Sequence, residues 1–344
     1  MIRRALLSIL VVLGTVTVTF YFSHLLPGNP AALYAGSSPS PEEIQRITLQ
    51  YGFNKPPWVQ YWIYVTGILS GNLGISNVVR QPVATLVFQA LPNSLTLAAM
   101  AAIIAAIIGI PLGILAARSR NRRLDSILRI FSMGLVAIPQ FWSGLILQIV
   151  FFSILHVLPL GGYGGSLFFF NQHPIPTITG SYVIDALISG NFAAEGQLLW
   201  SLILPLATLS AYPIGVVIRQ TRAAMIATLN QDYVRTARAY GISRREIEMK
   251  YALKNAFGPI LVSLGLIFAG SLIGVVFVED IFVLQPGLGY LVRIGLGVGT
   301  TSTSIGAPDV PLILGVSVVV CIVYVVTNFA VDMIQLLVDR RITV

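Results

Sequence analysis

Long apolar runs alternate with short polar stretches along this chain, and the runs have the length of membrane-spanning helices. They are free of Asp, Glu, Lys and Arg and lie at about residues 5–26, 95–117, 130–155, 198–218, 259–278 and 310–331. At 1.5 Å per residue, a helix of about 20 residues crosses a bilayer core of about 30 Å. The pattern therefore predicts an all-α membrane protein with six transmembrane helices.

Pro111 lies inside the second run, where it predicts a kink, and prolines also interrupt the third and fourth runs. The third run breaks at Pro139, which is followed closely by Phe141 and Trp142, and the fourth run contains Pro213. Broken helices in transporters often line the solute pathway, but a proline can equally shape helix packing alone. These four residues are candidates for a pathway, and both interpretations stay open at this point.

A more polar segment, residues 27–93, separates the first two runs. Ser40-Pro41-Glu42-Glu43 has the residue types of a helix start, and four aromatic residues cluster between Trp58 and Tyr64, as is typical of a helix at a membrane interface. The expected parts are therefore a first transmembrane helix (1–26), an extracytoplasmic segment with short helices (27–93) and a five-helix core (94–344).

The charged stretch 223–258 between the fourth and fifth runs predicts two short helices joined by a tight turn. Residues up to Tyr240 favour a helix, with Tyr233, Ala237 and Tyr240 spaced to share one face. Gly241 then ends this first helix. Many Arg and Lys residues keep the stretch in water.

The second short helix has its own start signal. Ser243 and Glu246 match a capping box, in which each side chain satisfies an exposed amide of the other residue. We expect the helix that begins there to end near Asn255.

Composition and charge narrow the class of protein. The chain has 344 residues, of which 56% are hydrophobic and only 10% charged, with a mean hydropathy of +0.83. Soluble domains carry about 25% charged residues, so a multi-pass membrane protein is the class that fits. The basic residues fall in blocks between the apolar runs instead of forming one patch, which argues against nucleic-acid binding.

The blocks of basic residues also predict the orientation. With six spans and both termini in the cytoplasm, only four of the 21 Lys and Arg residues lie outside: Arg46, Lys55, Arg80 and Arg293. This asymmetry follows the positive-inside rule.

A family resemblance rests on the charged stretch. The run DYVRTARAYG from Asp232 to Gly241, with ALKNA at residues 252–256, resembles the coupling loop ("EAA" loop) of ABC importer permeases. It is most similar to the first permease subunit of dipeptide, oligopeptide and nickel importers. Arg235 stands where the wider family has Glu, and Lys254 where it has Pro. The resemblance implies that the following residues contact an ATPase: Asp232, Tyr233, Arg235, Thr236, Ala237, Arg238, Gly241 and Ser243.

The resemblance also implies a function and partners. The chain would form half of the translocation pathway for peptides, or for nickel chelates or oligosaccharides, in the inner or plasma membrane of a prokaryote. Its partners would be a second homologous permease, two cytoplasmic ABC ATPases and an extracytoplasmic solute-binding protein.

The sequence lacks the common motifs for nucleotide binding, hydrolytic catalysis and metal binding. No Lys follows a Gly, so a phosphate-binding loop is excluded, and ATP and Mg²⁺ are expected on the partner ATPases. Neither His-Glu-x-x-His nor Gly-x-Ser-x-Gly occurs, and His156 and His173 have no third ligand at metal-like spacing, so we expect neither enzymatic activity nor a cofactor. The alternative function is a self-sufficient secondary transporter or channel, although such proteins tend to carry ionisable groups at mid-membrane depth.

Overall fold

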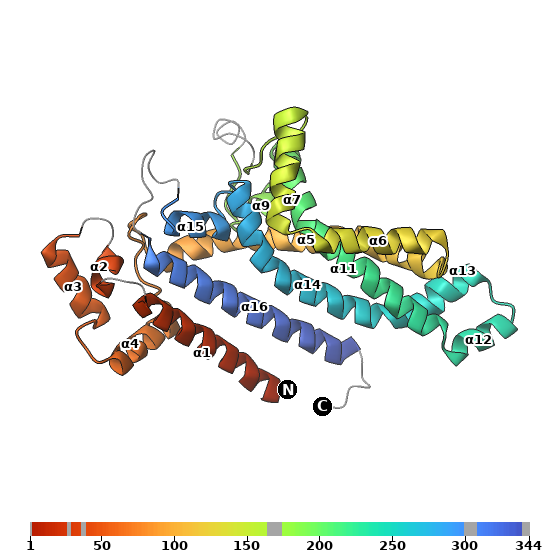
Figure 1. Ribbon diagram of the computed structural model, residues 1–344, viewed down its shortest axis with the longest axis horizontal. Coiled ribbons are helices and arrows are strands. Elements are labelled where there is room, and N and C mark those ends of the chain that lie inside the picture. Colours follow the sequence, from red (N-terminus) through yellow and green to blue (C-terminus); the bar gives the residue numbers. More distant parts are fainter. Residues whose placement is uncertain (1, 26–28, 36–38, 164–173, 299–307, 339–344) are drawn as a thin grey trace. The chain divides into compact units, whose positions relative to one another are not determined.

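Helices form the regular structure of this protein, as seen in a computed structural model that describes residues 2–25, 29–35, 39–163, 174–298 and 308–338 (Figure 1). Within these residues the only strand-like pairing is one isolated bridge between Ile75 and Pro82. The predicted all-α class is confirmed. The prediction for His173 lies outside the described residues.

The chain divides into two compact units, which are described separately. Unit 1 comprises residues 1–96, 161–199 and 275–326, and unit 2 comprises residues 97–160, 200–274 and 327–344. Unit 1 contains α1 (Ile2–Leu25), α2 (Pro30–Ala35), α3 (Pro41–Tyr51), α4 (Pro57–Leu69), α9 (Tyr182–Ile188) and α15 (Leu288–Gly295). Unit 2 contains α6 (Arg123–Ala137), α7 (Gln140–Leu147), η1 (Gln148–Ile154), α11 (Ile203–Leu229), α12 (Asp232–Ala239), α13 (Arg244–Glu246) and η2 (Ile247–Ala252). Four helices contribute residues to both units: α5 (Val83–Arg118), α10 (Phe192–Ser201), α14 (Leu253–Ile281) and α16 (Val310–Val338).

Several helices are long and apolar enough to cross a membrane. Among the described residues there are four: Val83–Arg118, Ile203–Leu229, Arg244–Ile281 and Val310–Met333. A fifth arises if the bent pair Arg123–Ala137 and Gln140–Ile154, which meet at 96°, is one broken span. In α1 the apolar portion Leu6–Phe22 is shorter than these. The multi-pass character is confirmed, with four or five spans by length and composition.

The helices extend beyond the apolar runs that predicted them. α5 begins at Val83 instead of Leu95, and α11 continues to Leu229 instead of ending near Ile218. The fifth helix begins at Arg244, so the predicted start at Pro259 is wrong and this proline lies inside the helix. Hydropathy marks only the part of a helix that lies in lipid, whereas the backbone hydrogen bonds continue into polar sequence.

In unit 1, the segment after α1 forms three short helices, of which α4 packs on α1 and α2 and α3 pack against α16. Ser40 caps α3 as predicted, because its Oγ accepts the amide of Glu43 at 3.2 Å. The hydroxyl of Tyr61 in α4 lies 2.8 Å from Oγ1 of Thr17 in α1. The indoles of Trp58 and Trp62 are exposed on α4.

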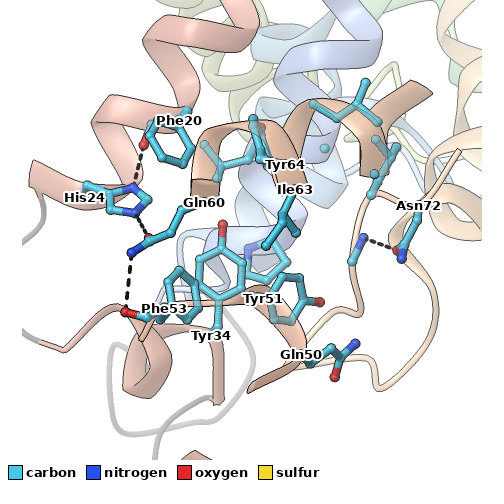
Figure 2. A pocket seen from close by; sticks show the side chains of 17 residues that line it. Phe20, His24, Tyr34, Gln50, Tyr51, Phe53, Gln60, Ile63, Tyr64 and Asn72 are labelled. Carbon is cyan, nitrogen blue, oxygen red and sulfur yellow. Dashed lines mark hydrogen bonds between the residues drawn. The ribbon is translucent and has the colours of Figure 1, made fainter. Parts of the chain in front are cut away.

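A small pocket of about 100 Å³ lies in unit 1, lined by residues of α1, α3, α4 and α16 (Figure 2). His24 at the end of α1 places Nε2 2.8 Å from Oε1 of Gln60, and Nδ1 2.9 Å from the carbonyl of Phe20. Nε2 of Gln60 in turn donates to the carbonyls of Lys55 (2.7 Å) and Phe53 (3.3 Å). This chain of hydrogen bonds, drawn in part in Figure 2, ties the end of α1 to the segment that precedes α4.

The start of α15 is held by side chains of two other helices of unit 1. Oγ of Ser94 in α5 accepts the amide of Leu288 (3.0 Å) and donates to the carboxylate of Glu279 in α14 (2.6 Å). The same carboxylate accepts the amide of Gly289 (2.8 Å). A Cβ on Gly289 would clash with the carbonyl of Val276, so only glycine allows this approach. The Pro-Gly-Leu-Gly sequence is thus folded around a buried carboxylate.

Candidate functional site

The α12–η2 segment, residues 232–252 of unit 2, forms two short helical pieces on a small apolar base (Figure 1). Val234 and Ala237 of α12 are buried against Ile247 of η2. Leu229 and Ile242 pack at the edge of this cluster. Burial of these aliphatic side chains fixes how the two pieces lie against each other.

The tyrosines of α12 lie away from that base. We predicted that Tyr233, Ala237 and Tyr240 share one face, but only Ala237 of the three is buried. Tyr240 is 82% exposed, at the end of α12. The buried face is instead the one that carries Val234, because a β-branched aliphatic side chain packs in a small core without a polar group to satisfy.

The turn between the two pieces is built on Gly241. Its φ of +72° is left-handed, its amide donates to the carbonyl of Arg238 (3.0 Å), and the next amide, of Ile242, donates to the carbonyl of Ala237 (3.2 Å). No atom lies within 4 Å of the place that a Cβ would occupy here. Glycine is therefore required by the backbone conformation and not by lack of space.

Ser243 caps the second piece, as its sequence position predicts. Its Oγ accepts the amide of Glu246 at 3.3 Å. The Glu246 carboxylate pairs with Nζ of Lys250 (3.3 Å), one turn further along. The second piece does not end near Asn255 as predicted, since η2 continues directly into α14.

The predicted ATPase-contacting residues form the outer surface of this segment. Seven of the eight are exposed, and Ala237, which lies beneath them, is the exception. Asp232 and Arg235 pair at 3.4 Å, with most of both side chains in solvent, and Oγ1 of Thr236 donates to the carbonyl of Asp232 (3.1 Å). The exposed surface thus carries both charges and two tyrosines above a fixed base.

A buried carboxylate joins this segment to the end of α5. Glu248 of η2 is only 3% exposed and lies 2.7 Å from Nε of Arg118 and 2.8 Å from Nε of Arg244. The Arg244 guanidinium also donates to the carbonyl of Arg118 (3.0 Å). This ion-pair cluster attaches the α12–η2 segment to α5, in addition to its covalent continuity with α11 before it and with α14 after it.

A second buried carboxylate joins the start of α6 to α11. Asp125 is fully buried and forms a bidentate pair with Arg222, at 2.6 and 2.8 Å. It also accepts the amide of Asn121 at 3.1 Å, while Arg129 lies 3.9 Å away. Two fixed hydrogen bonds to one guanidinium give such a pair a defined orientation.

A side chain at the bend between α6 and α7 bonds to the carbonyl that the proline of α11 leaves without a helical donor. Pro213 has no amide hydrogen, so the carbonyl of Leu209, four residues earlier, loses its helical donor. Nε2 of Gln140, at the start of α7, donates to that carbonyl at 3.1 Å. This bond joins the residue after Pro139 to the turn of α11 that precedes Pro213. The side chains of Phe141 and Trp142 are about half exposed.

Sequence reasoning missed Glu248, Asp125 and Gln140. The spacing of Arg244 and Glu248, four residues apart on a helix, is a local signal that points to one of these contacts. Arg118 and Arg222 are separated from their partners by about a hundred residues or more, so no local pattern reveals them.

Comparison with known families accounts for nearly the whole chain. Residues 109–344 match the family described as "Binding-protein-dependent transport system inner membrane component", and residues 1–98 match the N-terminal family of the same membrane components. The chain belongs to this family. It is a permease subunit of an ABC importer in the inner membrane, a non-catalytic component of a transport complex.

Curated relatives of this permease cover nearly its full length. It is 40% identical, over 97% of its residues and 94% of the relative, to the probable D,D-dipeptide transport system permease protein DdpB of Escherichia coli K12. It is 34% identical to the dipeptide transport system permease protein DppB of Alkalihalophilus pseudofirmus, over 99% of this chain and 98% of the relative. DppB of Lactococcus lactis subsp. cremoris is 31% identical over the same shares. The predicted resemblance to the peptide branch of the importers is confirmed.

Proposed function

We propose that this permease carries dipeptides, or peptides of similar size, and that its α12–η2 segment docks a cytoplasmic ATPase. The observation that carries the docking proposal is the exposed surface of the segment, held on a buried base and attached to both α5 and α14. The substrate proposal rests on the relatives, which are named as dipeptide and D,D-dipeptide permeases.

The attachments of the segment suggest how ATP would drive transport. Two ATPases that close on ATP would pull this segment and its counterpart on a second permease together. Because Arg244–Ile281 is one helix, displacement at its start would tilt α14, and the cluster of Glu248 with Arg118 would move α5 with it. The pathway would then open alternately to each side, and a solute-binding protein would deliver the peptide to the outward-facing state.

The proposed topology has six spans and cytoplasmic termini. α1 would be the first span, the bent pair α6 and α7 with η1 the third, and the four long helices the others. In this arrangement the α12–η2 segment lies in the cytoplasm with its many Arg residues, in agreement with the positive-inside rule. The segment 27–93, with its exposed tryptophans, would lie at the outer surface.

A substitution at Gly241 tests the docking proposal. A β-branched residue reaches the left-handed conformation at a cost of about 1 kcal/mol or more, which is too little to unfold the protein but enough to re-aim α12. Gly241→Val should therefore lower co-purification of the ATPase subunits and lower transport, with insertion near normal. Gly241→Ala, which has no β-branch, should have a smaller effect.

Gly190 offers a matched control in unit 1. It also has a left-handed φ, of +69°, and open space within 4 Å of the place that a Cβ would occupy. Gly190→Val should therefore impose similar backbone strain and leave ATPase binding unchanged. Equal ATPase binding by wild type, Gly241→Val and Gly190→Val would refute the docking proposal.

A further inference from the structure

A hollow of about 660 Å³ in unit 2 has no role in the docking surface described above. It lies among α5, α14 and α16, and Gln220 of α11 also reaches it. Small residues make the space: Ala99 and Ala102 on α5, Gly258 and Gly265 on α14, and Ala330 on α16. The predicted pathway candidates Pro139, Phe141, Trp142 and Pro213 are not among its lining residues.

Three polar side chains from two helices line this hollow, and they make no hydrogen bond to other protein groups among the described residues. Gln220 of α11, Thr327 of α16 and Gln335 of α16 line it, and within the described contacts their side chains make no hydrogen bond. Several hydroxyls elsewhere in the spans have partners: Thr208 donates to the carbonyl of Leu204 (2.9 Å) and Ser271 to that of Ile267 (2.7 Å). Thr327 lies within the sixth apolar run, where an unpaired hydroxyl that faces hydrocarbon is unfavourable. Gln220 and Gln335 lie just past the ends of the fourth and sixth apolar runs, where water can reach them. Together the three side chains suit water or a polar solute in the hollow.

The chemistry of the lining selects a class of solute. Its polar groups are uncharged, namely two carboxamides and the hydroxyls of Ser263 and Thr327, and no Asp, Glu, Lys or Arg lines the described walls. A carboxamide offers one acceptor oxygen and two donor hydrogens, which complement the N–H and C=O of a peptide bond. Apolar walls formed by Leu261, Val262 and Phe268 suit side chains of varied shape.

We propose that this hollow is the surface on which the permease contacts its peptide, through the backbone amide and not through the charged termini. The proposal deepens the proposed function and rests on it for the substrate class. Because recognition falls on groups that every peptide shares, the site would accept peptides of different side chains. Specificity would then be left to the solute-binding protein.

Cysteine labelling in the assembled transporter tests whether the hollow is wet. In a Cys321→Ala background, Thr327→Cys should react with a charged, membrane-impermeant methanethiosulfonate applied to open membrane fragments. Leu266→Cys is the matched control, because Leu266 is 53% exposed on α14 but does not line the hollow. Reaction of Thr327→Cys no faster than that of Leu266→Cys would show that lipid or another subunit covers this face, and that result overturns the proposal.

Uptake of radiolabelled dialanine tests the recognition chemistry. Loss of one neutral hydrogen bond weakens binding about five-fold. Gln220→Leu and Gln335→Leu should therefore raise the KM for dialanine by about that factor, with Gln89→Leu, an exposed glutamine of α5 outside the hollow, as the control. An unchanged KM in both hollow variants contradicts the proposal. Wild-type vesicles that take up no dialanine contradict the substrate class instead, and the labelling result does not depend on it.

Discussion

Buried carboxylates paired with arginine hold several helix ends of unit 2 in place. Glu248 is bound by Arg118 and Arg244, and Asp125 by Arg222. A buried carboxylate that loses its partners is strongly unfavourable, so these pairs define one orientation even where their net contribution to stability is small. The pairs of Glu248 fix the orientation of the proposed docking segment.

Replacement of Glu248 should leave ATPase binding intact but weaken the coupling of ATP hydrolysis to transport. Glu248→Gln keeps the size of the side chain but removes the charge-assisted bonds to two guanidiniums, a loss of about 1–3 kcal/mol. We expect the ATPase to bind at normal levels while the transport rate per ATP hydrolysed falls. The control is Glu246→Gln, whose pair with Lys250 is exposed and contributes about 0–1 kcal/mol. Equal transport per ATP in the two variants would show that the Glu248 cluster has no part in coupling.

Single residues also show how far sequence reasoning reached. Ser40, Gly241 and Ser243 were predictable because a cap or a left-handed turn depends on residues within one helical turn. The partners of Glu248 and the bond from Gln140 to the carbonyl of Leu209 were not, because tertiary packing alone brings them together. The spacing of Tyr233, Ala237 and Tyr240 did not predict which face of α12 is buried, and the structure buries the face of Val234 and Ala237.

Among the helices, α9 of unit 1 is held by the turn that precedes it. The Asp185 carboxylate accepts hydrogen bonds from the amides of Ile178 (3.1 Å), Thr179 (2.7 Å) and Gly180 (3.1 Å), and from the Thr179 hydroxyl (2.7 Å). Asn93 of α5 accepts the amide of Tyr182 at 3.0 Å. The Asp185 carboxylate and the Asn93 carboxamide thus hold the start of α9.

Stability of this element should depend on acid pH. Burial by itself raises the pKa of Asp185, but the four hydrogen bonds outweigh it and hold the pKa below its usual 3.8. A lowered folded-state pKa means that the stabilisation is complete above the unfolded-state pKa and is lost as the pH falls through the folded-state value.

Thermal unfolding of the detergent-solubilised protein tests this dependence. The wild type should lose stability as the pH drops below about 4, and Asp185→Asn should be destabilised at pH 7 and lose less on acidification. Asp232→Asn is the control, since the Asp232 side chain is 93% exposed. If Asp185→Asn and wild type show the same pH profile, the carboxylate does not anchor α9.

Hydropathy predicted where the long helices lie but not the residues at which they begin and end. α5, α11 and the helix from Arg244 all continue past the apolar runs, since polar residues at a span's end remain helical in water. The consequence is functional. The second piece of the proposed docking segment, from Arg244 onward, is continuous with the fifth long helix, which an apolar-run boundary at Pro259 conceals.

For the whole molecule, the six-span arrangement makes a prediction about sidedness. In a Cys321→Ala background, cysteines at Ser126 and Ser243 should react with an impermeant maleimide only from the cytoplasmic side. Reaction of Ser243→Cys from the outer side of intact cells would rule out both the topology and a cytoplasmic docking segment. Both positions lie beside basic residues, and the positive-inside rule therefore places them in the cytoplasm. The labelling should report the same side.

The central claim is that the exposed end of α12 touches an ATPase, and a photo-reactive benzoylphenylalanine in place of Tyr240 tests it most directly. Tyr240 is 82% exposed, and Trp62 of α4, at 63%, is the control site in unit 1. Irradiation of membranes that contain the assembled transporter should join Tyr240, and not Trp62, covalently to an ATPase subunit. An ATPase adduct from Trp62, or none from Tyr240 in a complex that still transports, would contradict the account.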